Sequence, residues 1–434
     1  MAITEDVLDQ AIDRARRRLV PFLLLMYVVS FLDRANIGFA KQAFQASTGI
    51  SEAAYALGAG LFFLTYALLE VPSNLIMRRV GVKIWMSRIM VTWGLVSAAT
   101  MFATSRTSFY LVRLLLGAAE AGFFPGVILY LTYWFPNRVR CRVLGLFYFG
   151  APLASILGGP VSGLLLELNG RTGLQGWQWM FLVEGLLSVA VGVWAYFYLD
   201  NNPDDARWFI PTEKKALLTQ LSLEEHERCA HGPSAFLPVL TNLRVLHFAA
   251  IYFLIQMIVY GVVFYLPTEV AAILGKSVGL EVGLVSAIPW ICALAAVFWL
   301  PRMGDRYNNH RLLAILILAT SGCTSIMSAA SEPVTALIAL CLTVSGFVAV
   351  QPLFWTFPTS YLAGSAAAGG IAMVNAFGTL GGFVGPNLKA WADRRFESPI
   401  AGHYFLAGIA VLGATLMTFV GHRKTALRAE ARQS

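Results

Sequence analysis

Long apolar stretches alternate with short polar ones along almost the whole chain. A membrane-spanning helix needs about 20 mostly apolar residues, and stretches of that length recur between turn and charge signals. They predict twelve spanning helices, near residues 19–43, 52–77, 83–104, 107–135, 140–167, 178–199, 243–273, 279–301, 310–330, 333–361, 365–390 and 400–421. The predicted fold class is therefore an all-α integral membrane protein.

One long polar segment, Asp200 to Thr241, divides these helices into two sets of six. It predicts an N-terminal half over 1–200, a linker over 201–241 and a C-terminal half over 242–434. The halves also share landmarks at nearly constant spacing, such as Gly-Pro pairs in the fifth and eleventh helices. Two such repeats around a central cavity are typical of secondary transporters, which bind substrate near the bilayer midplane.

The composition excludes a soluble protein. Of 434 residues, 57% are hydrophobic and 13% are charged, whereas a soluble domain has about 25% charged residues. The net charge of +8 comes from short basic groups spread between apolar stretches, a distribution that excludes a nucleic-acid binder. The sequence has no CxxC spacing, no metal-spaced histidine cluster and no nucleophile motif, so we expect neither a bound metal nor an enzyme.

Basic residues are distributed unevenly between the two predicted membrane faces. Of the 32 lysines and arginines, 22 lie on the side of the two termini and seven on the opposite side. Because basic loops stay in the cytoplasm, both termini are predicted to be cytoplasmic. The Arg-rich start of the chain leads directly into the first span, so we expect no cleaved signal peptide.

Charged residues inside predicted spans are costly, and they concentrate in the N-terminal half. Asp33 and Arg34 lie near mid-depth in the first helix, while Arg113, Gly117 and Glu120 share one face of the fourth. Arg113 and Glu120 are about 10 Å apart along that helix, so each is expected to face the first helix or a substrate. Arginine suits a carboxylate and a desolvated acid can exchange a proton. Together these residues predict a proton-coupled anion site, and a static ion network between the two helices is the alternative.

The C-terminal half has no Asp, Glu, Lys, Arg or His from Pro333 to Leu388, so it can contribute only hydrogen bonds and apolar contacts. Its candidates are Gln351, Trp355 and Asn375, and Tyr66 on the second helix is a similar case in the N-terminal half. Interhelical hydrogen bonding or packing is the alternative for each. Among the other charges in spans, Glu70 and Arg88 are expected to pair with loop charges, and Glu184 is left open.

Several spaced motifs resemble the anion:cation symporters of the major facilitator superfamily. The first-helix segment 31–40, FLDRANIGFA, and the fourth-helix segment 113–125, RLLLGAAEAGFFP, both resemble signatures of that family. Segments 130–136, 176–181, 355–358 and 369–375 resemble the branch that contains tartrate and 4-hydroxyphenylacetate permeases. The resemblance implies the two-halved fold of that superfamily and proton-driven uptake of an organic anion by alternating access.

The resemblance also assigns roles to individual residues. The acids that match Asp33 and Glu120 bind the coupling proton in relatives that take up sugar acids. Positions that match Arg34, Tyr66, Trp355 and Asn375 contact substrate there; Arg113 and Gln351 are our further candidates for substrate binding.

The resemblance is incomplete at one loop and at one position in the first helix. The superfamily's loop between the second and third helices usually carries a glycine and an aspartate. Both are missing around Arg79, whereas Gly304, Asp305 and Arg306 retain the motif after the eighth helix. These four residues are candidates for gating. Phe31 stands where relatives have a tyrosine, which favours a less polar ligand.

The predicted function is a symporter that imports a small organic carboxylate, an aromatic or a hydroxy acid, through a bacterial inner membrane. The proton is the coupling ion, and no other cofactor is expected. An exchanger or uniporter of the same fold is the alternative, and only dependence on a pH gradient separates the two. A receptor or a membrane enzyme is disfavoured, because we find neither a signalling domain nor a catalytic constellation. Expected partners are the substrate anion, protons and the bilayer, without nucleic acid, and we expect a monomer.

Overall fold

The computed structural model describes residues 5–170, 173–231, 233, 235, 237–275, 280–330, 332–398 and 400–420, and these residues form helices and connections without a strand. The first half contains α1 (Glu5–Thr48), α2 (Glu52–Val80), α3 (Val82–Ala99), η1 (Thr100–Phe102), α4 (Arg106–Glu120), α5 (Phe123–Trp134), α6 (Asn137–Phe147), α7 (Gly150–Leu166) and α8 (Gly176–Tyr198). The helix α9 (Pro211–His231) and the short η3 (Leu237–Thr241) follow. The second half contains α10 (Leu243–Val263), α11 (Leu266–Leu274), α12 (Leu280–Tyr307), α13 (His310–Ala330), α14 (Pro333–Tyr361), α15 (Gly364–Arg395) and α16 (Ala401–Thr418).

All twelve predicted spans correspond to helices, but three that were predicted as continuous are each divided in two. Span 107–135 becomes α4 and α5, span 140–167 becomes α6 and α7, and span 243–273 becomes α10 and α11. Pro267 near the start of α11 explains the last break, because a proline inside a helix removes a hydrogen bond. Within the described residues, eleven stretches are long and apolar enough to cross a membrane. The predicted span 83–104 is not among them, because Lys83 and Arg88 lower the mean hydropathy of α3; this helix nevertheless packs along α8.

The break between α4 and α5 is built by a glycine and two polar residues of α2. Gly122 has φ of +92°, a left-handed conformation that costs other residues free energy. The Ser73 hydroxyl donates to the carbonyl of Ala121 at 2.7 Å, and the Asn74 amide donates to the carbonyl of Gly122 at 3.3 Å. The carbonyls freed by the break are thus satisfied inside the protein, as a membrane interior requires, and α4 ends at Glu120.

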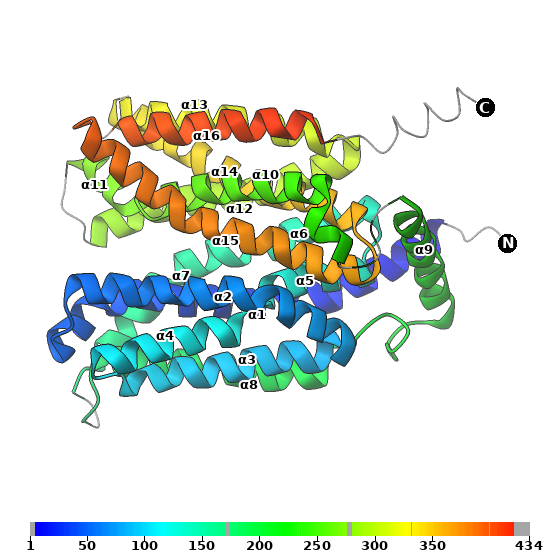
Figure 1. Cartoon of the computed structure of the whole chain (residues 1–434), viewed down its shortest axis with the longest axis horizontal. Helices are drawn as coiled ribbons and strands as arrows, with labels where there is room; N and C mark the ends of the chain where they lie inside the picture. Colours follow the sequence, from blue (N-terminus) through cyan, green and yellow to red (C-terminus); the bar gives the residue numbers. More distant parts are fainter. Residues whose placement is uncertain are drawn as a thin grey trace.

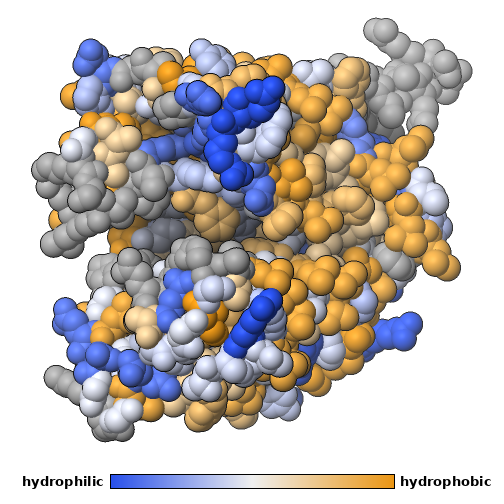
Figure 2. Space-filling view, turned by 60° about the vertical axis from the view of Figure 1, so that its left-hand side comes forward, coloured by the Kyte–Doolittle hydropathy of each residue, from blue (hydrophilic) through white to orange (hydrophobic). Residues whose placement is uncertain are grey.

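The two sets of helices form two bodies that meet along the middle of the molecule. Figure 1 shows α1 to α4 and α8 below α10, α13 and α16, with both ends of the chain and α9 on the right-hand side. We call this side the terminal face. Figure 2, turned so that the opposite side comes forward, shows a hollow between the two bodies on that side. The molecule is therefore open on the face away from its termini.

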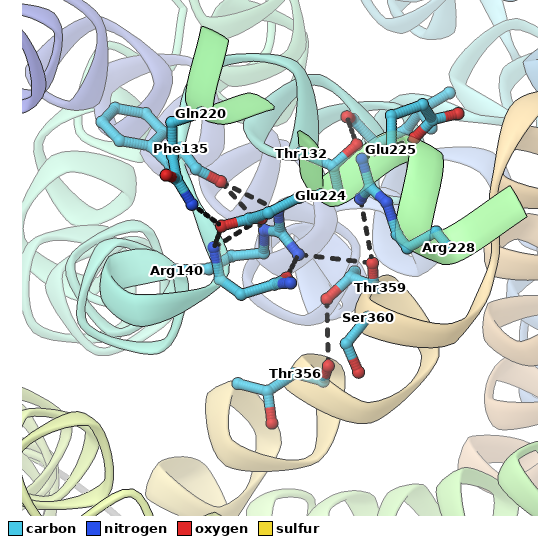
Figure 3. A network of polar contacts seen from close by, with 12 residues as sticks. Thr132, Phe135, Arg140, Gln220, Glu224, Glu225, Arg228, Thr356, Thr359 and Ser360 are labelled. Atoms are coloured by element: carbon cyan, nitrogen blue, oxygen red, sulfur yellow. Dashed lines mark hydrogen bonds and ion pairs between the residues drawn. The ribbon is translucent and has the colours of Figure 1, made fainter. Parts of the chain in front are cut away.

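Side chains from both halves and from α9 close the terminal face. Arg140 of α6 donates to the carbonyl of Thr359 on α14 at 3.3 Å, and Arg228 of α9 donates to the same carbonyl at 3.3 Å (Figure 3). Glu224 of α9 accepts from the backbone amide of Asn137 at 3.0 Å and lies 3.7 Å from Arg140. The helix α9 therefore bonds to both halves at the same point.

The outer surface of the bundle is apolar. Large hydrophobic side chains such as Leu68, Leu164, Phe197 and Trp299 are more than 60% exposed, and much of the face in Figure 2 is orange. Such a surface suits lipid rather than water. The polar groups that this lipid-facing surface lacks lie between the helices.

We expect Gly122→Ala to lower the thermal unfolding temperature of the detergent-solubilised protein. The left-handed conformation costs an alanine roughly 1–2 kcal/mol, and its Cβ would lie 2.4 Å from the Ser73 hydroxyl oxygen. Gly163→Ala is the matched control, because Gly163 lies inside α7 and a Cβ there meets nothing within 4 Å. Equal unfolding temperatures for the two variants would contradict the role of Gly122.

Candidate functional site

The first helix directs two neighbouring charged side chains to different surroundings. The Arg34 side chain is 23% exposed and interacts electrostatically with Tyr260 of α10, in the opposite half. The Asp33 residue is 3% exposed and turns towards α3. Consecutive helical positions point about 100° apart. The same short motif therefore directs Arg34 to the space between the halves and Asp33 to the interior of the first half.

Arg34 forms an ion pair with Glu120, the last residue of α4. Its Nη2 lies 2.6 Å from Glu120 Oε1, and its Nε donates to the same oxygen at 2.7 Å. The hydroxyl of Ser30, one turn earlier on α1, donates to this oxygen at 3.2 Å. The Glu120 side chain is fully buried, so its charge depends on Arg34 for compensation. The sequence predicted a partner for Glu120 on the first helix, and the structure confirms that contact.

Aromatic rings surround the Arg34 guanidinium. Its Cζ lies 5.1 Å from the ring centroid of Tyr66 and 5.8 Å from those of Phe31 and Phe62. A cation within about 6 Å of a ring is attracted by its face. Tyr66 also interacts with Glu70 on the next turn of α2. The predicted residue Tyr66 is thus in the same site as Arg34.

Asp33 is held by neutral donors from α3. Trp93 donates from its indole nitrogen to Oδ2 at 2.7 Å, and Ser97 donates to Oδ1. Arg113 of α4 interacts electrostatically with Asp33. The Arg113 guanidinium lies 4.9 Å from the Phe62 ring, and its Nε donates to the carbonyl of Gly58 at 3.4 Å. Asp33 and Arg113 therefore belong to the interior of the first half.

Close packing of α4 on α2 fixes this arrangement. A Cβ at Gly117 would lie 2.2 Å from the carbonyl oxygen of Phe62, and Thr65 donates to the carbonyl of Leu114 at 2.8 Å. The sequence places Gly117 between Arg113 and Glu120 on one face of the helix, where a residue without a side chain could leave open space. That space is filled instead by the backbone of α2, so Gly117 serves helix packing.

The three candidates of the second half have different surroundings. Trp355 is fully buried, and its ring lies 4.8 Å from Tyr252 and 6.2 Å from Phe124 of the first half. The amide of Gln351, one turn earlier, donates to the carbonyl of Phe347 at 3.3 Å. Gln351 therefore bonds within α14, while Trp355 packs at the contact between the halves.

Asn375 does not bond within its own half. Its Nδ2 donates to Glu70 Oε1 at 2.5 Å, across the contact between α15 and α2. The expected pairing of Glu70 with loop charges is therefore wrong, because Glu70 is fully buried between the helices. Its position seven residues before the end of the predicted span 52–77 was a sequence signal of this depth, which the expectation of pairing with loop charges did not use.

A fourth buried acid, Glu184 of α8, also belongs to the interior. It is 3% exposed, and it interacts with Asn36 and Asp33 of α1. The interior of the first half thus contains four buried acids, Asp33, Glu70, Glu120 and Glu184, together with the arginines Arg34 and Arg113.

The gating candidates lie on the terminal face. Asp305 Oδ2 accepts from the backbone amide of Arg142 at 2.8 Å, and its Oδ1 lies 3.0 Å from His310 Nε2. This contact joins α6 of one half to α12 of the other. A Cβ at Gly304 would lie 2.8 Å from a side-chain carbon of Leu353, so this residue permits close packing against α14.

The other two candidates are not part of this contact. Arg79 is exposed and lines a surface cavity of about 510 Å³ with Asn201 and Asp205. Arg306 is exposed beside Tyr307. Of the predicted gating residues, Asp305 joins the halves directly. Arg79 and Arg306 have exposed side chains on the terminal face.

Cys141, Asp305 and His310 bring possible metal-ligating atoms within 4.8 Å of one another. Both carboxylate oxygens of Asp305 already bond to Arg142 and His310, and two arginines, Arg140 and Arg142, flank Cys141 in the chain. A positive environment opposes a divalent cation. We therefore assign these side chains to the contact between the halves.

Comparison with known proteins places this arrangement in a family. The model of the Major Facilitator Superfamily matches residues 23–386. The chain is 48% identical over 411 residues to the inner membrane transport protein RhmT of Escherichia coli (strain K12), with 95% of each chain covered. It is 41% identical over 414 residues to a putative tartrate transporter of Agrobacterium vitis, again with 95% of each chain covered.

Solved structures share the fold at low identity. The proton:xylose symporter XylE bound to 6-bromo-6-deoxy-D-glucose has a TM-score of 0.76 at 15% identity, over 94% of this chain and 96% of that chain. The human organic anion transporter MFSD10 has a TM-score of 0.69 at 14% identity, over 93% and 99%. With two helical halves, a hollow on one face and a charged pair between α1 and α4 of the first half, the chain belongs to the major facilitator superfamily, as a transporter on the branch of the tartrate transporters.

Proposed function

We propose that the protein is a proton-coupled symporter that imports a small organic carboxylate, an aromatic or a hydroxy acid, by alternating access. It works in a bacterial inner membrane as a monomer, with both termini in the cytoplasm. The terminal face is then the cytoplasmic face, and the hollow in Figure 2 opens to the outside. The excess of basic residues on the side of the termini supports this orientation.

Arg34 is the group that binds the substrate carboxylate in this proposal. Its guanidinium is partly exposed, whereas its partner Glu120 is fully buried. The described contacts with Glu120 use Nε and Nη2, and the planar fork has a second edge that can bind another carboxylate. Phe31, Phe62 and Tyr66 offer ring faces around it, which suit an aromatic ring or the C–H face of a hydroxy acid.

The Arg34–Glu120 ion pair is the single observation that carries proton coupling. The pair is electrically neutral, so adding a substrate anion leaves one uncompensated negative charge in a water-poor site. Such a charge is costly, and one proton on Glu120 removes it. Substrate and proton therefore enter together, and both leave when the opposite face opens. Asp33, beside Arg113, is the second candidate for a coupling proton.

The relatives support the substrate class. A putative tartrate transporter of Agrobacterium vitis is 41% identical to the chain, and tartrate is a small hydroxy acid with two carboxylates. Tartrate therefore serves as the hydroxy-acid probe. The probe for an aromatic acid is 4-hydroxyphenylacetate.

We expect Arg34→Lys to weaken binding of the transported probe about 10- to 100-fold. Hydrogen bonds to charged groups contribute roughly 1.5–3 kcal/mol, and lysine keeps the charge but loses the planar fork. The measurement is a thermal-shift titration of the purified protein, because a ligand of the folded state raises its unfolding temperature. Arg88→Lys, at a half-buried position on α3 away from the pair, is the matched control. Unchanged affinity in the Arg34 variant would remove Arg34 from the substrate site.

We expect Glu120→Gln to abolish accumulation driven by an inward proton gradient while counterflow between equal substrate pools persists. The glutamine cannot release a proton, yet it leaves Arg34 free to bind the anion. Uptake of labelled probe into proteoliposomes, with and without a pH gradient, measures both activities in one preparation.

Asp33→Asn is the parallel variant, and it tests whether the second acid is also needed for accumulation. If both variants accumulate substrate normally under the gradient, proton coupling by these acids is wrong and the protein is an exchanger or uniporter.

A further inference from the structure

Glu70 is an acid that the proposed coupling does not use. It is fully buried on α2, and its Oε1 accepts from Asn375 Nδ2 on α15 at 2.5 Å. Its other oxygen, Oε2, has no hydrogen-bond partner among the described residues. Two neutral side chains therefore support this carboxyl group, Tyr66 one turn earlier on α2 and Asn375, and the Asn375 amide belongs to the opposite half.

Glu70 has no cationic side chain that pairs with it alone among the described residues that interact with it. The charged and titratable side chains that interact with it are Arg34 of α1, Glu120 of α4, Tyr66 of α2 and Tyr252 of α10. The one cation in this set, Arg34, is already paired with Glu120 at 2.6 Å. A buried acid without a counter-ion is stable in its neutral form, in which Oε2 carries the proton and Oε1 still accepts from Asn375.

Charge balance in the first half leads to the same conclusion. The interior of this half contains four buried acids and two arginines, and Glu120 and Asp33 interact with Arg34 and Arg113. Neutrality of the group then requires a proton on each of the other two acids, Glu70 and Glu184. Of these two, Glu70 bonds across the contact between the halves.

Glu70 lies at a position where separation of the two halves would change its access to water. It lies ten residues before Val80, the end of α2, which is about 15 Å from the terminal face. It is therefore on the closed side of the Arg34 site. When the terminal face opens in alternating access, α2 and α15 separate and water reaches the carboxyl group.

We propose that Glu70 is a further proton-binding residue, and that its protonated form closes the terminal face through the hydrogen bond from Asn375. Opening of this face breaks the hydrogen bond, and the proton passes to water on that side. Closing requires the proton to return, because the charged carboxylate would otherwise re-enter a dry contact. The proposal rests on the alternating access of the proposed function, but it predicts a titration that needs neither substrate nor a proton gradient.

A native cysteine reports on this contact. Cys141 of α6 is fully buried, and its Sγ lies 3.6 Å from the carbonyl oxygen of Pro352 on α14. Opening of the terminal face exposes this thiol. We therefore propose to replace Cys229, Cys292, Cys323 and Cys341 by serine in the full-length protein, and to measure alkylation of Cys141 by N-ethylmaleimide from mildly acidic to mildly alkaline pH.

The alkylation rate depends on pH both through ionisation of the Cys141 thiol and through titration of Glu70. The Glu70→Gln variant in this background separates these two effects. Glutamine keeps a neutral acceptor for Asn375 and cannot titrate, so its alkylation rate follows ionisation of the thiol alone. We expect the rate in the parent to exceed that of the variant by roughly tenfold at alkaline pH, the effect of leaving a buried polar group unsatisfied, and to equal it at acidic pH. Asn375→Ala removes the donor and should raise the rate at every pH.

The direction of these effects distinguishes the proposal from misfolding. An unfolded variant exposes Cys141 and reacts faster, whereas Glu70→Gln is expected to react more slowly than the parent. Glu70→Asp, which titrates but reaches less far, should react faster than Glu70→Gln at alkaline pH. The same pH dependence in the parent and in Glu70→Gln would overturn the proposal, even if uptake proves to be proton-coupled. The alkylation test does not use transport rates. Failure of the symport proposal is therefore detected separately, by the uptake measurements in proteoliposomes.

Discussion

The requirement for electrical neutrality in a water-poor interior determines most of the arrangement around the site. Glu120 is fully buried and would be costly as an isolated charge, so its carboxylate needs Arg34 at 2.6 Å. Arg34 in turn must lie where α1 can reach both α4 and the space between the halves. One ion pair thus fixes the relative positions of two helices and presents a cation to the hollow.

Irregular backbone makes this geometry possible. The α4 helix ends at Glu120 because Gly122 adopts a left-handed conformation, and α2 satisfies the exposed carbonyls through Ser73 and Asn74. The same helix carries Tyr66 and Glu70 beside the site. The α2 helix therefore acts as the support of the charged group, although the ion pair itself lies between α1 and α4.

The sequence was sufficient to predict the helices and the principal charged residues. Apolar length and the scarcity of charge predicted the spans, and the cost of charge in lipid selected Asp33, Arg34, Arg113 and Glu120. Local pattern did not predict the break at Gly122, because a glycine within an apolar stretch is compatible with a continuous helix. It also failed for Glu70, whose partner Asn375 lies on a helix of the other half; such a contact depends on how the halves dock, which no periodicity records.

The linker helix α9 has a kinetic consequence. It bonds to α6 through Glu224 and to α14 through Arg228, one turn further along. When the halves separate on this side, α9 can remain with only one of them, so one set of charge-assisted bonds must break before the face opens. The side chains that make these bonds, Arg140, Glu224 and Arg228, are all less than 10% exposed, so dissolved ions screen them little. The activation barrier for opening therefore includes the loss of these buried bonds, and salt in the adjoining compartment changes it little.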